Sequence, residues 1–138
     1  MATASEALSE LGITEWVMRG DPQTEAEFKE MFRKVTGADA NGSAIESDDT
    51  SKWGVTWKQV SDKMTAIDAA APMVELRRQR DAKLAETDWT ALSDVTMADN
   101  MKTYRQALRD LPASNDGKNA SLASDGSLEN VKWPQKPA

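Results

Sequence analysis

The sequence contains neither cysteine nor histidine. The lack of cysteine excludes disulfides, a thiol nucleophile and cysteine-based metal sites. The lack of histidine removes the commonest general acid–base group and the commonest zinc ligand, which leaves only carboxylates for catalysis. Carboxylate pairs such as Asp81 and Asp88 have no neighbouring residues that mark a pocket, and helix caps account for them better. We therefore expect no catalytic residues, no metal site, no cofactor and no enzymatic activity.

Long apolar runs and an excess of positive charge are also absent. Residues 1–6 contain no basic group and begin no apolar run, so the sequence supports neither a secretion signal nor a membrane span. The chain carries 17 Lys and Arg against 23 Asp and Glu, a net charge of -6, whereas a general nucleic-acid binder needs a basic face. We expect a soluble protein made in a cytoplasm, without a membrane or nucleic-acid partner.

The first 54 residues predict three short elements. Residues 3–11 have the leucine spacing of a short helix, and residues 13–18 form an apolar run that predicts a short strand or an extended arm. Thr24 is followed three residues later by glutamate, which is the pattern of a capping box, and apolar residues at helical spacing continue the predicted helix to Gly37. The residues that follow, as far as Gly54, are polar turn formers and predict a loop.

A second capping box predicts another helix. Thr56 and Gln59 have its spacing, and the apolar residues behind them predict a helix that ends in the alanines at residues 69–71. Pro72 follows directly. Because proline is well tolerated in a first helical turn, we predict that a new helix begins there.

The third helix leads into a turn that carries two large apolar residues. Residues 73–86 show one apolar stripe at helical spacing, which includes Leu76 and Leu84. Thr87-Asp88 ends the helix, because short oxygen-bearing side chains favour a turn. We predict that Trp89 and Leu92 then fold back onto the stripe, and that Trp89 is substantially buried there.

A fourth helix and a tail complete the chain. Thr96 is the predicted N-cap of a helix that Pro112 stops, since an interior proline removes a backbone donor and clashes with the preceding turn. Residues 113–130 are rich in serine, asparagine, aspartate and glycine, which predicts mobility. Trp133 stands between Val131 and Pro134, and a lone tryptophan there is expected to occupy a pocket on this chain or on another.

Together these elements predict an all-α fold in three parts. The parts are a helical N-terminal module over residues 1–71, a helical hairpin over 72–112, and a flexible tail over 113–138 with a Trp-Pro anchor. The mean hydropathy of -0.63 leaves a thin core for this length, which favours burial against a partner.

The second half of the sequence resembles a known family. The runs Arg77 to Asp94, Tyr104 to Pro112 and Val131 to Pro134 are similar to an R-x-x-R-D-x-x-L…T-D-W-x-x-L-x-D…Y-R-x-x-L-R-D-L-P…W-P pattern. This pattern forms the C-terminal module of bacteriophage tail-fibre assembly and tail assembly chaperone proteins, and it recurs at the ends of phage virion structural proteins. The resemblance covers residues 73–138. In the marine phage structural proteins an E-F-x-x-x-F-R-K-V-T-G run precedes the hairpin, as Glu27 to Gly37 does here.

The resemblance implies a bacteriophage tail protein that acts by binding. It works either as a chaperone for tail or fibre subunits or as a component of the virion, so it is expected in the virion tail or in the cytoplasm of the infected bacterium. Its partners are other phage tail or fibre proteins, and an oligomer within the virion is compatible with this role. Aromatic and arginine side chains suit such contacts. The expected contact residues are Arg77, Arg80, Trp89, Leu92, Tyr104, Arg105, Arg109 and Trp133.

Two alternatives stay open at the level of sequence. The acidic charge also fits a phage effector that binds a host protein. The arginines on the two hairpin helices either dock onto another phage protein or act as internal clamps, since a guanidinium holds a carboxylate with two parallel hydrogen bonds. The internal carboxylates available to them are Asp81, Asp88, Asp94 and Asp110.

Overall fold

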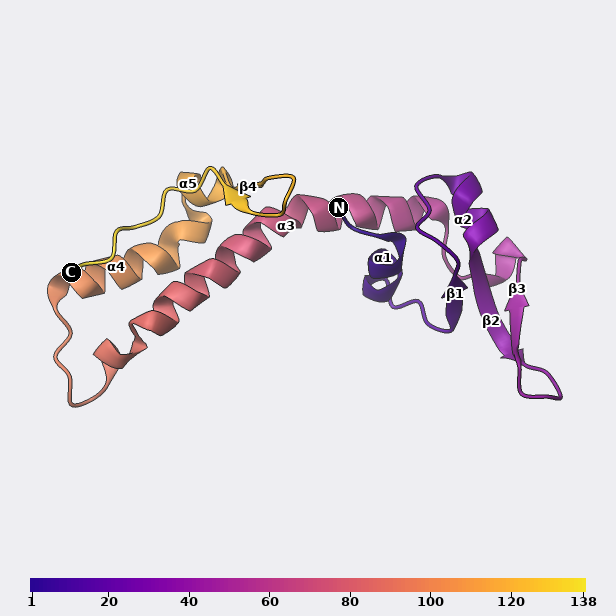
Figure 1. Cartoon of the computed structure of the whole chain (residues 1–138), viewed down its shortest axis with the longest axis horizontal. Coiled ribbons are helices and arrows are strands. Elements are labelled where there is room, and N and C mark those ends of the chain that lie inside the picture. The colour runs from indigo at the N-terminus through magenta and orange to yellow at the C-terminus, as the bar shows by residue number, and fades with distance from the viewer. The chain divides into compact units, whose positions relative to one another are not determined.

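The computed structural model describes all residues from Met1 to Ala138 and divides into two compact units, Met1–Ala69 and Ala70–Ala138 (Figure 1). The prediction of an all-α fold is wrong. About 51% of the residues are helical and 13% lie in strands, with a three-stranded sheet in the first unit and a two-stranded sheet in the second. No helix combines the length and the apolar composition that crossing a membrane requires.

The first unit begins as the sequence indicates. Helix α1 (Ala4–Glu10) starts with a capping box between Thr3 and Glu6 and is followed by Gly12, whose positive φ of 75° suits the end of a helix. Strand β1 (Trp16–Met18) then confirms the strand alternative for the next apolar run.

Helix α2 (Glu25–Met31) is shorter than predicted. Its N-cap is confirmed, because the Thr24 hydroxyl accepts the N–H of Glu27 at 3.2 Å. The extension to Gly37 is wrong: Phe32 has an extended backbone, and strand β2 (Phe32–Ala38) begins there. Antiparallel partners are available on both sides of β2, and the β-branched residues in this strand suit a pleated surface.

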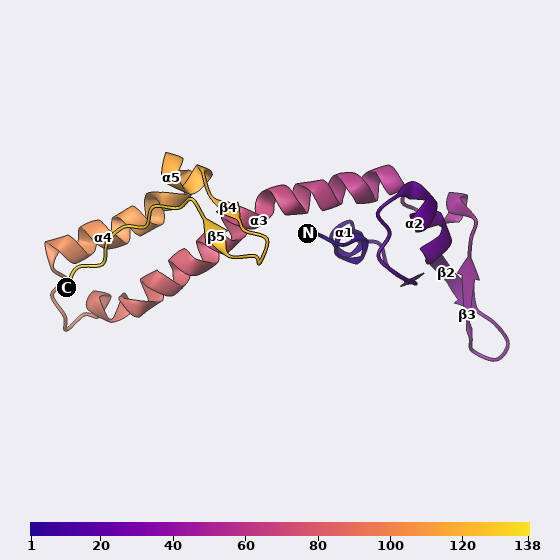
Figure 2. The ribbon, with the colours of Figure 1, turned by 45° about the horizontal axis from the view of Figure 1, so that its top comes forward.

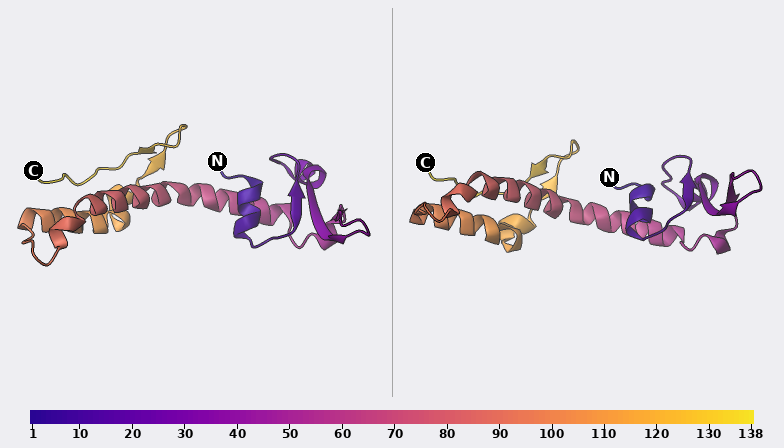
Figure 3. Two further views of the ribbon diagram at one scale, coloured as in Figure 1. Left: turned by 60° about the horizontal axis from the view of Figure 1, so that its bottom comes forward. Right: turned by 90° about the horizontal axis from the view of Figure 1, so that it is seen from below.

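The predicted loop between the helices also contains regular structure. Strand β3 (Ala44–Ser47) pairs with β2, and η1 (Thr50–Lys52) is a 3-10 turn. In the connecting turn the Asp39 carboxylate accepts the N–H groups of Asn41 and Ser43 at 2.8 and 3.0 Å. Residues 39–43 therefore form the turn of the β2–β3 hairpin, which is labelled in Figure 1 and is seen from two further directions in Figure 3.

Aromatic rings form the core of the first unit. Phe28 and Phe32 stack with their centroids 4.9 Å apart, and Trp53 meets both rings edge-on at 5.5 and 4.9 Å. Trp53 is 2% exposed although it lies within the predicted loop, and its ring N–H donates to the carbonyl of Ser47 at 2.8 Å. Leu8 of α1 is buried in the same cluster.

Helix α3 (Trp57–Glu86) is continuous through Pro72, so the prediction of a new helix at this proline is wrong. The capping box at its start is confirmed, since Thr56 and Gln59 each bond the other's backbone N–H, at 2.9 and 3.2 Å. The missing N–H of Pro72 costs one helical hydrogen bond, and the alanines before it have the highest helix propensity. The helix therefore continues.

The second unit contains the C-terminal part of α3 and the rest of the chain. Its elements are η2 (Asp88–Ala91), α4 (Asp99–Asp110), η3 (Leu111–Ala113), α5 (Asn115–Lys118), β4 (Ser121–Leu122) and β5 (Leu128–Glu129). Figure 2 shows α4 beside the end of α3, so the two form a helical hairpin. Its buried residues include Leu76, Tyr104 and Leu108.

The start of α4 differs from the prediction and its end agrees with it. The N-cap is Ala98, without a side-chain hydrogen bond, so the assignment of Thr96 as N-cap is wrong. The last helical residue is Asp110, two residues before Pro112, as the proline predicts.

Candidate protein-binding surface

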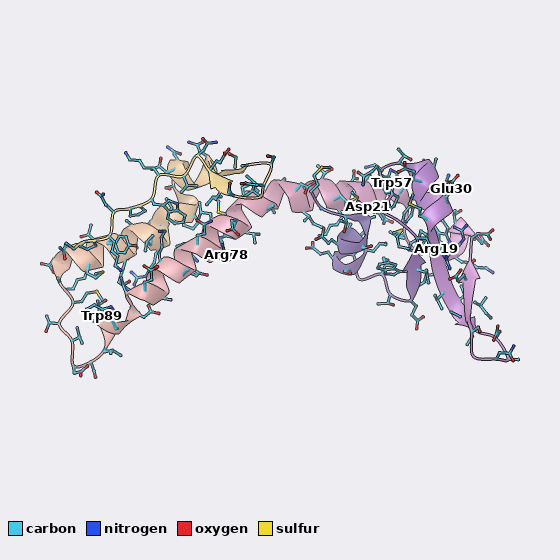
Figure 4. All side chains as sticks on the ribbon, in the orientation of Figure 1. Arg19, Asp21, Glu30, Trp57, Arg78 and Trp89 are labelled. Atoms are coloured by element: carbon cyan, nitrogen blue, oxygen red, sulfur yellow. The ribbon has the colours of Figure 1, made fainter.

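The turn that joins α3 to α4 exposes two large apolar side chains. Trp89 is 59% exposed and Leu92 is 56% exposed, so the prediction that Trp89 is buried is wrong (Figure 4). Residues three apart in a 3-10 turn lie on the same side. Thr87 and Thr90 take the inward side, at 1% and 5% exposure, which places Trp89 and Leu92 on the outward side.

The two threonines are buried because their hydroxyls find partners in the turn itself. The Thr87 hydroxyl donates to the carbonyl of Leu84 at 3.2 Å, and the Thr90 hydroxyl donates to the carbonyl of Thr87 at 2.6 Å. A buried hydroxyl is tolerated when it is hydrogen-bonded. Arg105 of α4 also donates to the Thr87 hydroxyl, so the inward side of the turn is filled and Trp89 faces outward.

A cavity of about 320 Å³ lies beside Trp89. Val95 and Met97 border it from the segment before α4, Met101 from the first turn of α4, and Pro137 from residues 131–138. We call the exposed apolar area here the tip surface; it consists of Trp89, Leu92, Val95, Met97 and Met101. The sequence placed Met97 and Met101 on one helical face, but it gave no sign that they face a cavity rather than the core.

Arg105 is an internal clamp. Its side chain is buried, and its guanidinium donates to the Leu84 carbonyl at 2.9 Å, the Thr87 hydroxyl at 2.7 Å and the Asp88 carboxylate at 2.9 Å. These bonds tie α4 to the end of α3. Its Nε is buried without a hydrogen-bond partner. For this residue the structure supports the clamp over docking.

The other expected arginines form no link between the two helices. Arg80 pairs with its sequence neighbour Asp81 at 2.8 Å, and Arg109 donates only to Gln106 at 3.2 Å. Arg77 is exposed and has no ion pair. The expected pairs with Asp94 and Asp110 are not formed by these arginines.

The remaining expected contact residues do not border the cavity beside Trp89. Tyr104 is 5% exposed, and burial raises the pKa of its hydroxyl. Trp133 is half-buried, with the Lys83 ammonium 5.0 Å from the centre of its ring. Beside Trp133 is a second cavity of about 400 Å³, bordered by Ala107 and Leu111. The structure thus brings Trp89 and Leu92 together and separates them from Trp133.

Charge divides unevenly between the units. Residues 1–69 carry 13 acidic and 7 basic side chains, whereas residues 70–138 carry 10 of each. The net charge of -6 therefore comes from the first unit. No group of three or more acidic side chains is placed to hold a metal ion.

A protein family matches the second unit. The model of the family described as phage tail assembly chaperone protein matches residues 73–138, which confirms the resemblance seen in the sequence. No curated protein and no solved structure matches the chain. The aromatic core of the first unit lies outside the matched region.

Proposed function

We propose that this protein is a non-enzymatic assembly chaperone that binds other phage tail proteins. The reason is that residues 73–138 form a phage tail assembly chaperone-like module. The family match supports a role in phage tail assembly, and it supports a place in the virion or in the cytoplasm of the infected cell. The match is the observation that carries the proposal.

The tip surface is the proposed contact. Trp89 and Leu92 are exposed on the same turn, and tryptophan is among the residues most often critical at protein interfaces. Arg77 and Arg109 are also exposed, on α3 and near the end of α4, and neither borders the cavity beside Trp89. Arg105 is a supporting residue rather than a contact, because its side chain is already bonded inside the unit.

A Trp89→Ala variant tests this surface. Since removal of a central tryptophan typically costs at least about 2 kcal/mol of binding energy, we expect the affinity for tail proteins to fall about 30-fold. The thermal unfolding of the variant should change little, because surface substitutions usually act within about 0.5 kcal/mol. The measurement is co-purification and titration with the tail proteins of the same phage, co-expressed with the chain.

Val74→Ala is the matched control. Val74 is 63% exposed on α3, so the change removes exposed apolar area away from the tip. Binding should be retained. Equal loss of affinity in both variants would show that the tip surface is not the contact.

The chaperone role is tested separately from the contact. A chaperone leaves the assembled tail, whereas a structural component stays in it. Quantitative proteomics of purified particles should find the chain absent or far below the copy number of the tail proteins. A constant whole-number ratio to those proteins would replace the chaperone role with that of a virion component.

A further inference from the structure

Residues 131–138 lie across the helical hairpin of the second unit, and we call them the strap. The strap runs past α4 in the opposite direction, as the course of the yellow segment in Figures 1 and 2 shows. Trp133 and Pro134 border the cavity near the end of α4, and Pro137 borders the cavity near its start. The strap therefore borders two of the cavities of the hairpin, one near each end of α4.

The strap is held by side chains alone. The Lys136 ammonium lies 3.7 Å from the Glu86 carboxylate, with both groups more than half exposed, and Lys83 lies over the ring of Trp133. No hydrogen bond joins residues 131–138 to the rest of the unit, whereas β4 and β5 just before them form a ladder. Exposed ion pairs contribute little, so the half-buried Trp133 is the main anchor of the strap, which can detach without breaking a backbone hydrogen bond.

We call the surface beneath the strap the groove; it consists of Lys83, Glu86, Met101, Ala107, Asp110, Leu111 and Asp116. The strap and the groove are chemically complementary. The strap contains two lysines, a tryptophan and two prolines, and it has no acidic residue. The groove presents Glu86, with Asp110 and Asp116 on the cavity that Lys132 also borders. Proline cannot donate a backbone hydrogen bond and favours an extended chain, which fits a segment held without such bonds.

We infer that the groove of the hairpin is a binding site for an extended segment that combines an aromatic residue, proline and lysine, and that the strap is its internal ligand. A segment of this chemistry in a phage tail protein takes the place of the strap when the two proteins bind. Displacement uncovers the cavity beside Trp89 and makes the tip surface continuous with the groove. This inference rests on the proposed binding of tail proteins and names the kind of segment that is bound.

The test uses a fluorescein-labelled peptide with the sequence of residues 131–138 and the full-length chain. Trp133→Ala removes the half-buried anchor of the strap, so fluorescence anisotropy should show at least tenfold tighter peptide binding by this variant than by the natural chain. Gln135→Ala is the matched control, because Gln135 is exposed and forms no hydrogen bond or ion pair; it should bind as the natural chain does. A peptide with alanine in place of its tryptophan should bind none of the three forms of the chain.

Two results would overturn the inference. Equal peptide affinity of the natural chain and Trp133→Ala would show that the strap does not occupy the groove, and no binding to either would show that no such site exists. Amide exchange is the control for folding. The amides of α4 should be as protected in Trp133→Ala as in the natural chain, which excludes unfolding as the cause of either result.

A third result would show that the groove binds a different partner. If the natural chain forms dimers at high concentration that Trp133→Ala loses, the groove takes the strap of a second copy instead of a tail protein. The peptide assay contains no tail protein, so it is independent of the proposed function. If Trp133→Ala binds the peptide but the chain captures no tail protein, the proposed function is contradicted. If the chain captures tail proteins but neither form binds the peptide, the groove is not a binding site for such a segment.

Discussion

At the scale of single residues, Arg105 determines how the hairpin closes. One guanidinium satisfies a carbonyl, a hydroxyl and a carboxylate at the end of α3. Arginine suits this position because its planar fork presents five donors, and a lysine ammonium has a different geometry. Without it, the Leu84 carbonyl and the Thr87 hydroxyl lose a charged donor in a buried place.

Arg105→Ala should therefore lower the free energy of unfolding by at least about 2 kcal/mol, since hydrogen bonds to charged groups contribute about 1.5–3 kcal/mol each and are not additive. Arg109→Ala is the control on the same helix. Arg109 is exposed, so its loss should cost less than about 0.5 kcal/mol. Denaturant titration of both variants measures the difference, and similar values would contradict the clamp.

Glu75 gives a residue-level prediction about pH. Hydrogen bonds from Arg78 and Gln79 lower the pKa of its carboxyl from 4.5 to about 2. A carboxyl with a lowered pKa in the folded state stabilises the fold above its unfolded pKa and loses this contribution as the pH falls. The stabilisation should be present above about pH 4.5 and lost by about pH 2, and it should be small, because exposed pairs are screened.

At pH 7 the natural chain should melt at a higher temperature than Glu75→Gln. This difference should disappear as the pH falls towards 2. Glu30→Gln removes an exposed carboxylate that forms no ion pair or hydrogen bond, so its difference at pH 7 should be smaller. A constant difference for Glu75→Gln across this range would refute the assignment.

At the scale of elements, the helix starts differ in how they are capped. The Thr56 hydroxyl accepts the N–H of Gln59 at 3.2 Å, whereas the N-cap of α4 is Ala98, which has no capping side chain. An N-cap hydroxyl satisfies a backbone donor that has no partner within the helix. The two predicted N-caps that are confirmed have a glutamate or a glutamine three residues later. The predicted cap that is wrong, Thr96, has an aspartate there.

Thr56→Ala should thus destabilise the protein by about 1 kcal/mol, the typical cost of losing an N-cap. Thr96→Ala changes an exposed threonine that caps nothing and should act within about 0.5 kcal/mol. Thermal unfolding compares the two. A larger loss for Thr96→Ala would mean that α4 begins earlier than Asp99.

At the scale of the whole molecule, each unit has a core of its own. Leu8 lies in the aromatic cluster of the first unit, and Leu108 is buried in the second; both are 0% exposed. Leu8→Ala and Leu108→Ala should each cost about 2–5 kcal/mol through the cavity they leave. We expect Leu8→Ala to increase amide exchange in residues 1–69 and Leu108→Ala to do so in residues 70–138. Loss of protection in both units by either variant would show one cooperative fold.

The sequence by itself determined features that depend on neighbours in the chain. The caps at Thr24 and Thr56, the end of α3 before Thr87 and the end of α4 before Pro112 each involve atoms within a few residues of one another. The motif runs of the second half likewise sufficed to identify the family that matches residues 73–138.

Tertiary structure alone decided the features that depend on residues far apart. Phe32 continues the apolar spacing of a helix, yet it begins a strand because β1 and β3 supply hydrogen-bond partners on both sides. Trp53 is buried because Phe28 and Phe32 meet it from another part of the chain. Trp89 is exposed because two threonines and Arg105 fill the inward side of its turn. Apolar spacing shows that a side chain can be buried, but burial requires a partner surface, and the fold decides where that surface lies.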